Sequence, residues 1–468
     1  MDALASLTER LPDGAVSTHP GELTSRSRDA WPLAMLREAR GERLPRPMAV
    51  VFPRSTEDVS ATLAWAVDTG TAVVPRGGGS GLTGAAQAEW RGIVLDLSFL
   101  NRVLGVDRES RTVEVEAGTH GDRLEAALGR EGLTLGHDPQ SLSFSSVGGW
   151  IASSSAGHTS AGFGAIGDLV LGLDAVLAGG DVLRLPAVPR PSAGPDLRRL
   201  LIGSEGTLAV ITRATLAVAP VSEGYRWRAL LFRRFEEGID AAREVAQSTV
   251  RPLMLRLFDD ADAASAFGDL GHEDGAVLLL GFGEDGTADG RAGTAVAMAE
   301  AAGGSPLPED YGERWWDHRN DGAGLYRRIM GEERMLGPGV VVDTVQVEAP
   351  WSALPRVYPV VRRALAEHAA RPVTAHLTHP HPAGAALSFG FLLHGQDDQA
   401  AEARYLRCWE DAARACREAG GSLGHGVGLL RSPFLEGEIG APGVAVLRAV
   451  KNALDPHGVL NPGKLLPG

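Results

Sequence analysis

The first 220 residues show hydrophobic patterns whose period changes over short distances. Residues 56–69 place Val59, Leu63 and Val67 on one face, which predicts a helix capped by Thr56. Apolar or alternating runs predict the other elements, namely strands at 71–74, 93–95, 111–117, 168–178 and 208–218 and a helix at 121–131. This half of the chain is therefore expected to be α+β with short strands.

The pattern changes after Pro220, where longer strands alternate with alanine-rich helices. The expected strands are 225–235, 254–259, 276–282 and 340–347, and the expected helices are 239–247, 294–302, 400–419 and 444–454. We expect an α/β cap domain with an antiparallel sheet. The predicted division is a first domain at 1–220 with its core at 43–220, a cap domain at 221–430, and a tail at 431–468 that returns to the first domain.

Composition and charge narrow the classes of partner. The formal net charge of −14 opposes binding to phosphate backbones, so no nucleic-acid partner is expected. No secretory leader and no uninterrupted apolar run of about eighteen residues appears, so no integral membrane segment is expected. We expect a cytoplasmic protein that acts on a small-molecule substrate, with a homodimer as the alternative to a single chain.

Residues 75–84 read P-R-G-G-G-S-G-L-T-G and follow a predicted strand, so their amides can close on a phosphate. They contain the G-x-G-x-x-G spacing of a Rossmann loop, but residues 85–92 are too few for a crossover of about ten to twelve residues. No Lys-Ser or Lys-Thr follows, which excludes a Walker A loop. Two further small-residue loops, at 145–157 and 203–207, favour one long cofactor with a pyrophosphate.

These motifs together resemble the FAD-linked oxidases of the vanillyl-alcohol oxidase type. The resemblance rests on the first loop, then H-D-P-Q-S-L-S-F-S-S-V-G-G-W-I, G-S-E-G-T-L-A-V-I-T and a terminal D-P-H-G-V-L-N-P-G-K. Within that family, P-R-P-S-A-G-P-D-L, A-P-W and G-G-S-L-G-H-G-V-G most resemble alkyldihydroxyacetonephosphate synthases. The resemblance implies an FAD-binding domain of the p-cresol methylhydroxylase (PCMH) type, followed by a cap domain that binds substrate.

The resemblance also implies which residues bind FAD. The first loop would hold the pyrophosphate, the second would pass the ribityl chain and ring, the third would line the adenine half, and the tail would close the site. The residues implied are Arg76, Gly77, Gly78, Gly79, Ser80, Gly81, Thr83, Pro139, Ser141, Ser146, Val147, Gly148, Ser153, Gly157, Glu205, Gly206, Ile211, Asn461 and Lys464. Several relatives attach FAD to a histidine where this chain has Ser80, so non-covalent FAD is expected.

A group of three histidines, His376, His379 and His381, invites a metal interpretation. Metal-dependent 2-hydroxyacid dehydrogenases of the superfamily have further ligands where this chain has Ser388 and Gly424, so no metal is expected. One alternative is that the three imidazoles only form hydrogen bonds within a strand and loop. The other is that His381 or His379 acts as an acid or base above the flavin.

His425 is the stronger candidate for proton transfer, because its glycine-rich turn lets a ring approach closely and the family places this turn beside the flavin. Arg334 precedes a strand and is a candidate for holding an anionic substrate, with a solvated helix-end arginine as the alternative. Arg256 stands in the apolar run M-L-R-L-F and faces either the cleft or the outer surface. The neighbouring tryptophans, Trp315, Trp316 and Trp351, are interpreted as packing residues.

The leading function is oxidation of a hydroxyl-bearing small molecule, an alcohol or 2-hydroxy acid, by hydride transfer to flavin N5. The alternative within enzymes is a transfer without net redox, like that of the synthases. That reaction is in doubt because the synthases have tyrosines where this chain has His381 and Ser388. A non-catalytic flavin-binding protein is the third hypothesis.

Overall fold

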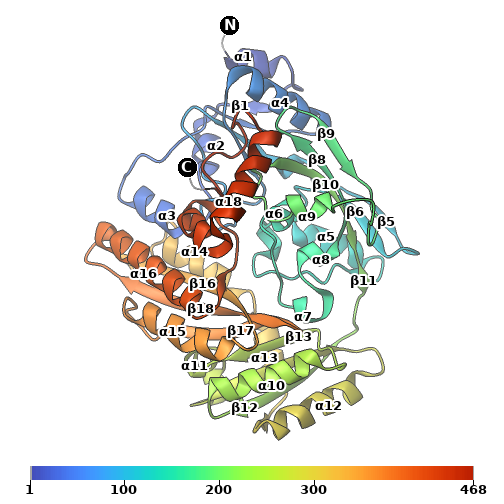
Figure 1. The fold of residues 1–468 in the computed structure, drawn as a ribbon, viewed down its shortest axis with the longest axis vertical. Coiled ribbons are helices and arrows are strands. Elements are labelled where there is room, and N and C mark those ends of the chain that lie inside the picture. The colour runs from blue at the N-terminus through green and yellow to red at the C-terminus, as the bar shows by residue number, and fades with distance from the viewer. Residues whose placement is uncertain (1–2, 467–468) are drawn as a thin grey trace.

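The computed structural model describes residues 3–466 and consists of two α/β parts with a separate hydrophobic core in each (Figure 1). The first part contains two main sheets. One has the order β1 (Val16–Ser17), β2 (Ala49–Val51), β4 (Ile93–Asp96), β3 (Val73–Arg76). The other is antiparallel, in the order β5 (Val103–Asp107), β6 (Thr112–Glu116), β10 (Ala209–Ala217), β8 (Val170–Leu177), β9 (Val182–Leu185). Two short strands, β7 (Leu133–Thr134) and β11 (Ala219–Pro220), pair separately.

Helices surround these sheets. They are α1 (Ala3–Thr8), α2 (Pro20–Ser25), α3 (Pro32–Ala39), α4 (Thr56–Thr69), α5 (Gly121–Gly129), α6 (Val147–Ala152), α7 (Ser160–Phe163), α8 (Ile166–Leu169) and α9 (Leu197–Leu201). The predicted helix at 56–69 is confirmed, but the prediction of its cap was wrong. Ser55 is the N-cap, because its hydroxyl accepts the amide of Asp58.

The second part is built on one antiparallel sheet of eight strands. Their order is β15 (Ser305–Leu307), β12 (Tyr225–Phe232), β14 (Ala276–Gly283), β13 (Met254–Phe258), β17 (Thr374–His381), β18 (Gly384–His394), β16 (Val340–Pro350), β19 (Ser422–Leu423). The helices are α10 (Phe235–Gln247), α11 (Asp260–Phe267), α12 (Ala288–Ala301), α13 (Asp310–His318), α14 (Asp321–Met330), α15 (Leu354–Ala366), α16 (Asp398–Glu418), α17 (Gly428–Arg431) and α18 (Leu435–Leu454).

Helices cover both faces of this sheet, which explains why every residue of β14 is buried. Leu278 and Leu280 of β14 pack in the core formed with α10, α12, α15 and α16, whereas Val277 and Leu279 pack with α11 and α13. The prediction of an α+β chain whose second part has an antiparallel sheet is confirmed.

Two segments cross between the parts. The N-terminal residues 31–36 pack in the core of the second part, although they precede the predicted boundary at residue 220. The tail returns to the first part, where Leu460 forms a parallel bridge to Val73 of β3. In Figure 1, α18 leads from the second part back toward the first.

Candidate active site

The structure brings the three small-residue loops together beside the edge of β3. The first loop packs so closely on the second that a Cβ on Gly77 would lie 2.1 Å from Ser146 Oγ, and one on Gly78 would lie 2.0 Å from the carbonyl oxygen of Phe144. The third loop joins the second through the amide of Glu205, which donates to the carbonyl of Ala152 at 2.9 Å. The glycines are therefore required by the close approach of one backbone to another.

The first loop offers amide donors to an anion. β3 and β4 are parallel neighbours, and the loop joins them without a helix, so the connection is not a Rossmann crossover. The amides from Gly78 to Thr83 donate no hydrogen bond within the described chain. Such a run of free N–H groups fits the pyrophosphate of FAD, which needs donors and little side-chain bulk.

The other residues implied to bind FAD lie around this loop. Arg76 begins the first loop, and its guanidinium donates to the carbonyl of Arg28 at 2.7 Å. Asn461 of the tail donates to the carbonyls of Ala85 at 2.9 Å and Glu205 at 2.7 Å, and so joins the first and third loops. Lys464 is buried and pairs with Glu89.

Members of the second loop have mainly structural contacts. Ser146 caps α6, which contains Val147 and Gly148, and Ser153 ends it. Gly157 lies against the backbone of Asp138, where a Cβ would be 2.6 Å from the amide nitrogen. Of the other residues implied in this loop, Pro139 is buried and the hydroxyl of Ser141 is hydrogen-bonded to that of Ser145.

The remaining implied residues belong to the first and third loops and to β10. In the first loop, Ser80 is half-buried and lies between Gly79 and Gly81. Gly206 has φ +70° and packs against Pro75, and Ile211 of β10 lies in the hydrophobic core.

Glu205 connects the third loop to the turn that carries His425. Its carboxylate accepts the amides of Val427 at 2.6 Å and Gly428 at 2.7 Å. Burial raises the pKa of Glu205, although these two amides and the charge on Arg431 act in the opposite direction. Both carboxylate oxygens are thus occupied by the turn, a role that the expected position beside the adenine did not include.

The turn that carries His425 lies between β19 and α17, and the residue is exposed in the described chain. The residue has a φ of +74°, which an L-residue adopts only under constraint. The surrounding protein lowers the pKa of His425 to about 4, and the charge on Arg431 adds to this. Arg431 itself is buried, donates to the carbonyl of Gly426 at 3.1 Å, and has an Nε without a partner.

His379 lies near His425 at the end of β17. Its Nδ1 is 2.8 Å from the hydroxyl of Ser160 on α7, so a histidine of the second part contacts the first part. Burial lowers the pKa of His379 to about 3, followed by the charges of His425, Arg256 and His376. Arg256 and His376 are in direct contact, and the charges of these two residues and of His425 act on His379, so we treat these predicted residues as one group.

Arg256 and His376 form the inner side of this group. Arg256 contacts His376 Nε2 at 2.5 Å, and His376 Nδ1 lies 2.8 Å from a carboxylate oxygen of Asp262. Burial lowers the pKa of Arg256 to about 10, while Asp262 opposes the shift. Trp315 packs against the guanidinium, 5.3 Å from the ring centroid.

Sequence reasoning missed two members of the group. His158 follows Gly157 directly, and its pKa is held well below the usual value by burial and then by the charges of Arg256, His379 and Arg319. Its position directly after the second small-residue loop was a usable signal. No local signal marked Asp262, because it reads as one more acidic residue at the start of a helix.

Two predicted residues are not part of this group. His381 is exposed in the hairpin between β17 and β18, where its ring accepts the amide of Ala383 at 3.1 Å. Arg334 pairs with Asp398 at 2.5 Å, at the start of α16. Among residues 3–466, no group of three or more His, Cys, Asp or Glu side chains has an arrangement that could hold a metal ion.

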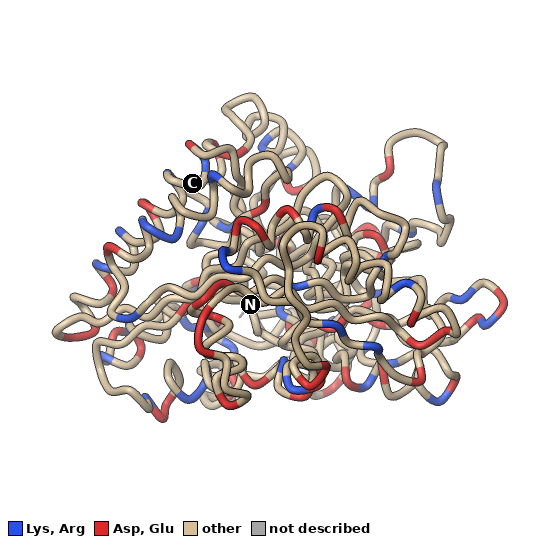
Figure 2. The backbone as a smooth tube through the Cα atoms, turned by 90° about the horizontal axis from the view of Figure 1, so that it is seen from below, with Lys and Arg blue, Asp and Glu red and all other residues tan. Residues whose placement is uncertain are grey.

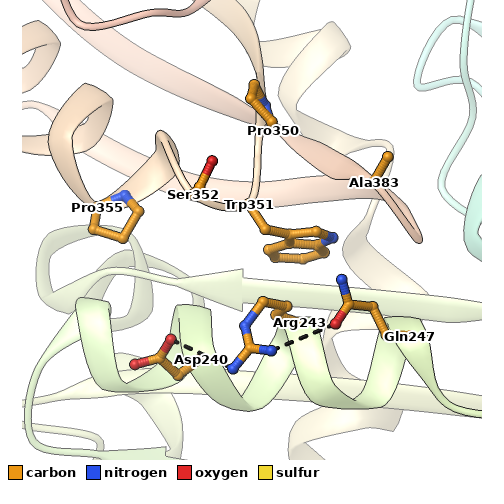
Figure 3. Close-up of a pocket in the computed structure, with 8 residues that line it drawn as sticks. All are labelled: Asp240, Arg243, Gln247, Pro350, Trp351, Ser352, Pro355 and Ala383. Carbon is orange, nitrogen blue, oxygen red and sulfur yellow. Dashed lines mark hydrogen bonds and ion pairs between the residues drawn. The ribbon is translucent and has the colours of Figure 1, made fainter.

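A separate surface pocket of about 470 Å³ lies between α10 and the start of α15 (Figure 3). Its lining residues are Asp240, Arg243, Gln247, Pro350, Trp351, Ser352, Pro355 and Ala383. None of them belongs to the loops or to the histidine group. Trp351 is 5 % exposed and donates to the carbonyl of His381 at 2.9 Å, as expected of a packing residue.

Comparison with known proteins identifies the family. The FAD binding domain model matches residues 47–186, and the model of the C-terminal domain of FAD linked oxidases matches residues 226–465. The chain belongs to the FAD-linked oxidase family, and FAD is its cofactor.

The relatives include a named synthase and an uncharacterized oxidoreductase. The chain is 31 % identical over 474 residues to alkyldihydroxyacetonephosphate synthase of Caenorhabditis elegans, covering 92 % of this chain and 77 % of that protein. It is 31 % identical over 443 residues to an uncharacterized FAD-linked oxidoreductase of Escherichia coli K12, covering 91 % of this chain and 90 % of that protein.

A solved structure of p-cresol methylhydroxylase with substrate bound superposes with a TM-score of 0.80 at 17 % identity, over 99 % of this chain and 96 % of that one. This confirms the predicted PCMH-type fold. No helix within residues 3–466 is long and apolar enough to cross a membrane. Figure 2 shows acidic and basic residues interspersed over the molecule.

Proposed function

We propose that this protein oxidises the hydroxyl group of a small molecule, an alcohol or a 2-hydroxy acid, with FAD as the hydride acceptor. The observation that carries the proposal is that hydrogen bonds hold both histidines against the FAD-binding part, the turn of His425 through Glu205 and His379 through Ser160. The pKa of each imidazole is lowered as well. A neutral imidazole has a free lone pair at neutral pH, which is the form that a general base requires.

In this proposal FAD, when bound, supplies the acceptor at N5. His425 takes the hydroxyl proton as the C–H bond breaks. Glu205 holds the turn of His425 against the first part through the amides of Val427 and Gly428. His379, held by Ser160, closes the side of the second part and helps to exclude water from the reacting atoms.

A synthase-like transfer without net redox is the second candidate, and the 31 % identity to a named synthase supports it. Against it stands the hairpin at 378–384, where His381 replaces the tyrosine of the synthases and is exposed to solvent. Ser388, at the second tyrosine position, is buried opposite Gln346 of β16. The location in the cytoplasm and the homodimer remain predictions. A non-catalytic role as a flavin-binding protein is the least favoured hypothesis.

Anaerobic flavin reduction tests the proposal. The holoprotein is mixed with a panel of alcohols and 2-hydroxy acids, and absorbance near the flavin maximum is followed together with the oxidised product. Bleaching with stoichiometric product supports oxidation. With an acyl ester added to the alcohols, replacement of its acyl group by an alcohol, with release of the carboxylic acid and without net bleaching, would identify the transferase. A flavin that no compound affects would indicate a binding protein.

A further inference from the structure

Arg256 is held in one orientation by contacts on three sides. It lies on β13, with its guanidinium carbon 5.2 Å from the ring centroid of Phe258 and 5.3 Å from that of Trp315. The third contact is end-on, at 2.5 Å from His376 Nε2. A guanidinium gripped in this way has lost the rotational freedom that an arginine on a surface keeps.

The hydrogen bonds fix the proton positions in this arrangement. Arginine only donates, so His376 Nε2 must accept and its proton must lie on Nδ1. That proton is then donated to Asp262 at 2.8 Å. Burial acts to raise the pKa of Asp262, but the bond from His376 and the charge of Arg256 outweigh it, so the pKa is lowered and the carboxyl is ionised.

Asp262 is itself held in place. It lies in the first turn of α11, where its amide donates to the carboxylate of Asp259 at 2.9 Å and where a negative side chain is favoured. Asp262, His376 and Arg256 therefore form a chain of hydrogen bonds that starts at a helix end and finishes at a guanidinium.

This guanidinium has a buried donor that is unused. The Nε of Arg256 is buried and has no hydrogen-bond partner within the described chain. The charge of Arg256 acts on His158, His379 and His376, and among the described residues the acidic group that acts on Arg256 is Asp262, on the far side of His376. A buried donor without a partner is costly, so an acceptor from outside the chain would be stabilised here.

We infer that Arg256 binds an anionic group of the substrate, a carboxylate or a phosphate, and that Asp262 acts through His376 as its positioning residue. The inference rests on the proposed function, because it places the anion beside His379 and the hydroxyl to be oxidised near His425. Charge-assisted bonds from a fixed guanidinium supply both affinity and orientation.

Equilibrium binding to the holoprotein tests this without turnover. Oxalate, inorganic phosphate and neutral glycerol are titrated separately, and binding is read from the flavin spectrum and from tryptophan fluorescence, since Trp315 contacts Arg256. Arg256→Gln should weaken binding of the preferred anion roughly 10-fold or more, and leave glycerol unchanged. The anion that responds identifies carboxylate or phosphate as the substrate group.

Matched variants separate positioning from general damage. Asp262→Asn should weaken binding of the same anion by a smaller factor than Arg256→Gln, and Asp262→Glu should keep part of the affinity that Asp262→Asn loses. Asp260→Asn in the same helical turn should leave anion binding unchanged. Arg226→Gln on β12 is the control for Arg256. Added guanidinium should restore anion binding to Arg256→Ala.

Unchanged anion binding in Arg256→Gln, or equal weakening of anion and glycerol, would overturn the inference. Because binding needs no reaction, failure of the panel in flavin reduction leaves this result interpretable. Conversely, turnover without any anion binding that depends on Arg256 would support the proposed oxidation and overturn the proposed anion site.

Discussion

The carboxylate of Glu205 accepts the backbone amide of Val427 at 2.6 Å, although 222 residues separate them in the chain. This bond ties a loop of the FAD-binding part to the turn that carries His425. The position of a catalytic candidate in one part is therefore set by a side chain from the other.

Replacing Glu205 with Gln tests this connection. One of its two acceptor oxygens becomes a donor facing an amide, so we expect a loss of about 1–3 kcal/mol in the free energy of unfolding, measured by denaturant titration. Flavin reduction should slow while FAD stays bound. Glu114→Gln, a partly exposed pair with Arg213 in the same part, should leave both quantities unchanged.

The first loop predicts a sharp effect at Gly78. Gly78→Ala places a Cβ 2.0 Å from the carbonyl oxygen of Phe144, so the loop must move and FAD content should fall. Gly78→Asp adds a carboxylate near the pyrophosphate and should abolish binding. Gly129→Ala on α5, with nothing within 4 Å, is the control. Full flavin content in Gly78→Asp would contradict the assignment of this loop.

FAD is expected to be released when the protein unfolds. Ser80 cannot form the bond that a histidine makes to the flavin in several relatives. After acid precipitation of the yellow protein, the flavin absorbance should appear in the supernatant. Colour retained in the pellet would show a covalent link at another residue.

We predict different effects on flavin reduction for substitutions of the histidines, although His379 and His381 are only two residues apart. His425→Asn should slow flavin reduction on the order of 10²- to 10⁴-fold with FAD retained, as expected for loss of a general base. His379→Asn should also slow it, whereas His381→Asn should not, because that ring is in an exposed hairpin. A larger effect of His381→Asn would show that the hairpin closes over the site.

The pH dependence follows from the lowered pKa of His425. The neutral form is the active one and is lost as the pH falls through the folded value of about 4, so reduction should be level near neutrality and decline only in acid. His425→Asn should remove this acid limb. A limb near the ordinary histidine value of about 6.5 that vanishes in the variant would mean that the ring is not held neutral.

The sequence predicted elements and loops well because these depend on local periodicity and glycine spacing. It did not predict which histidines meet. A bulge in the pairing of β17 with β18 lies between Thr378 and His381, and His379 has a φ of +49°, so its ring leaves the alternation of the strand. Nor did it place Asp262, whose partner His376 is 114 residues away. Such pairs depend on the register of a sheet, which local patterns do not fix.

The tail has a consequence for the order of assembly. β3, which leads into the first loop, forms an isolated bridge to Leu460, and Asn461 reaches Ala85 across 376 residues of chain. Contacts of such separation close late, because the intervening chain must be ordered first. During synthesis the first loop emerges long before Leu460 and Asn461, so we expect the protein to acquire flavin only late in folding.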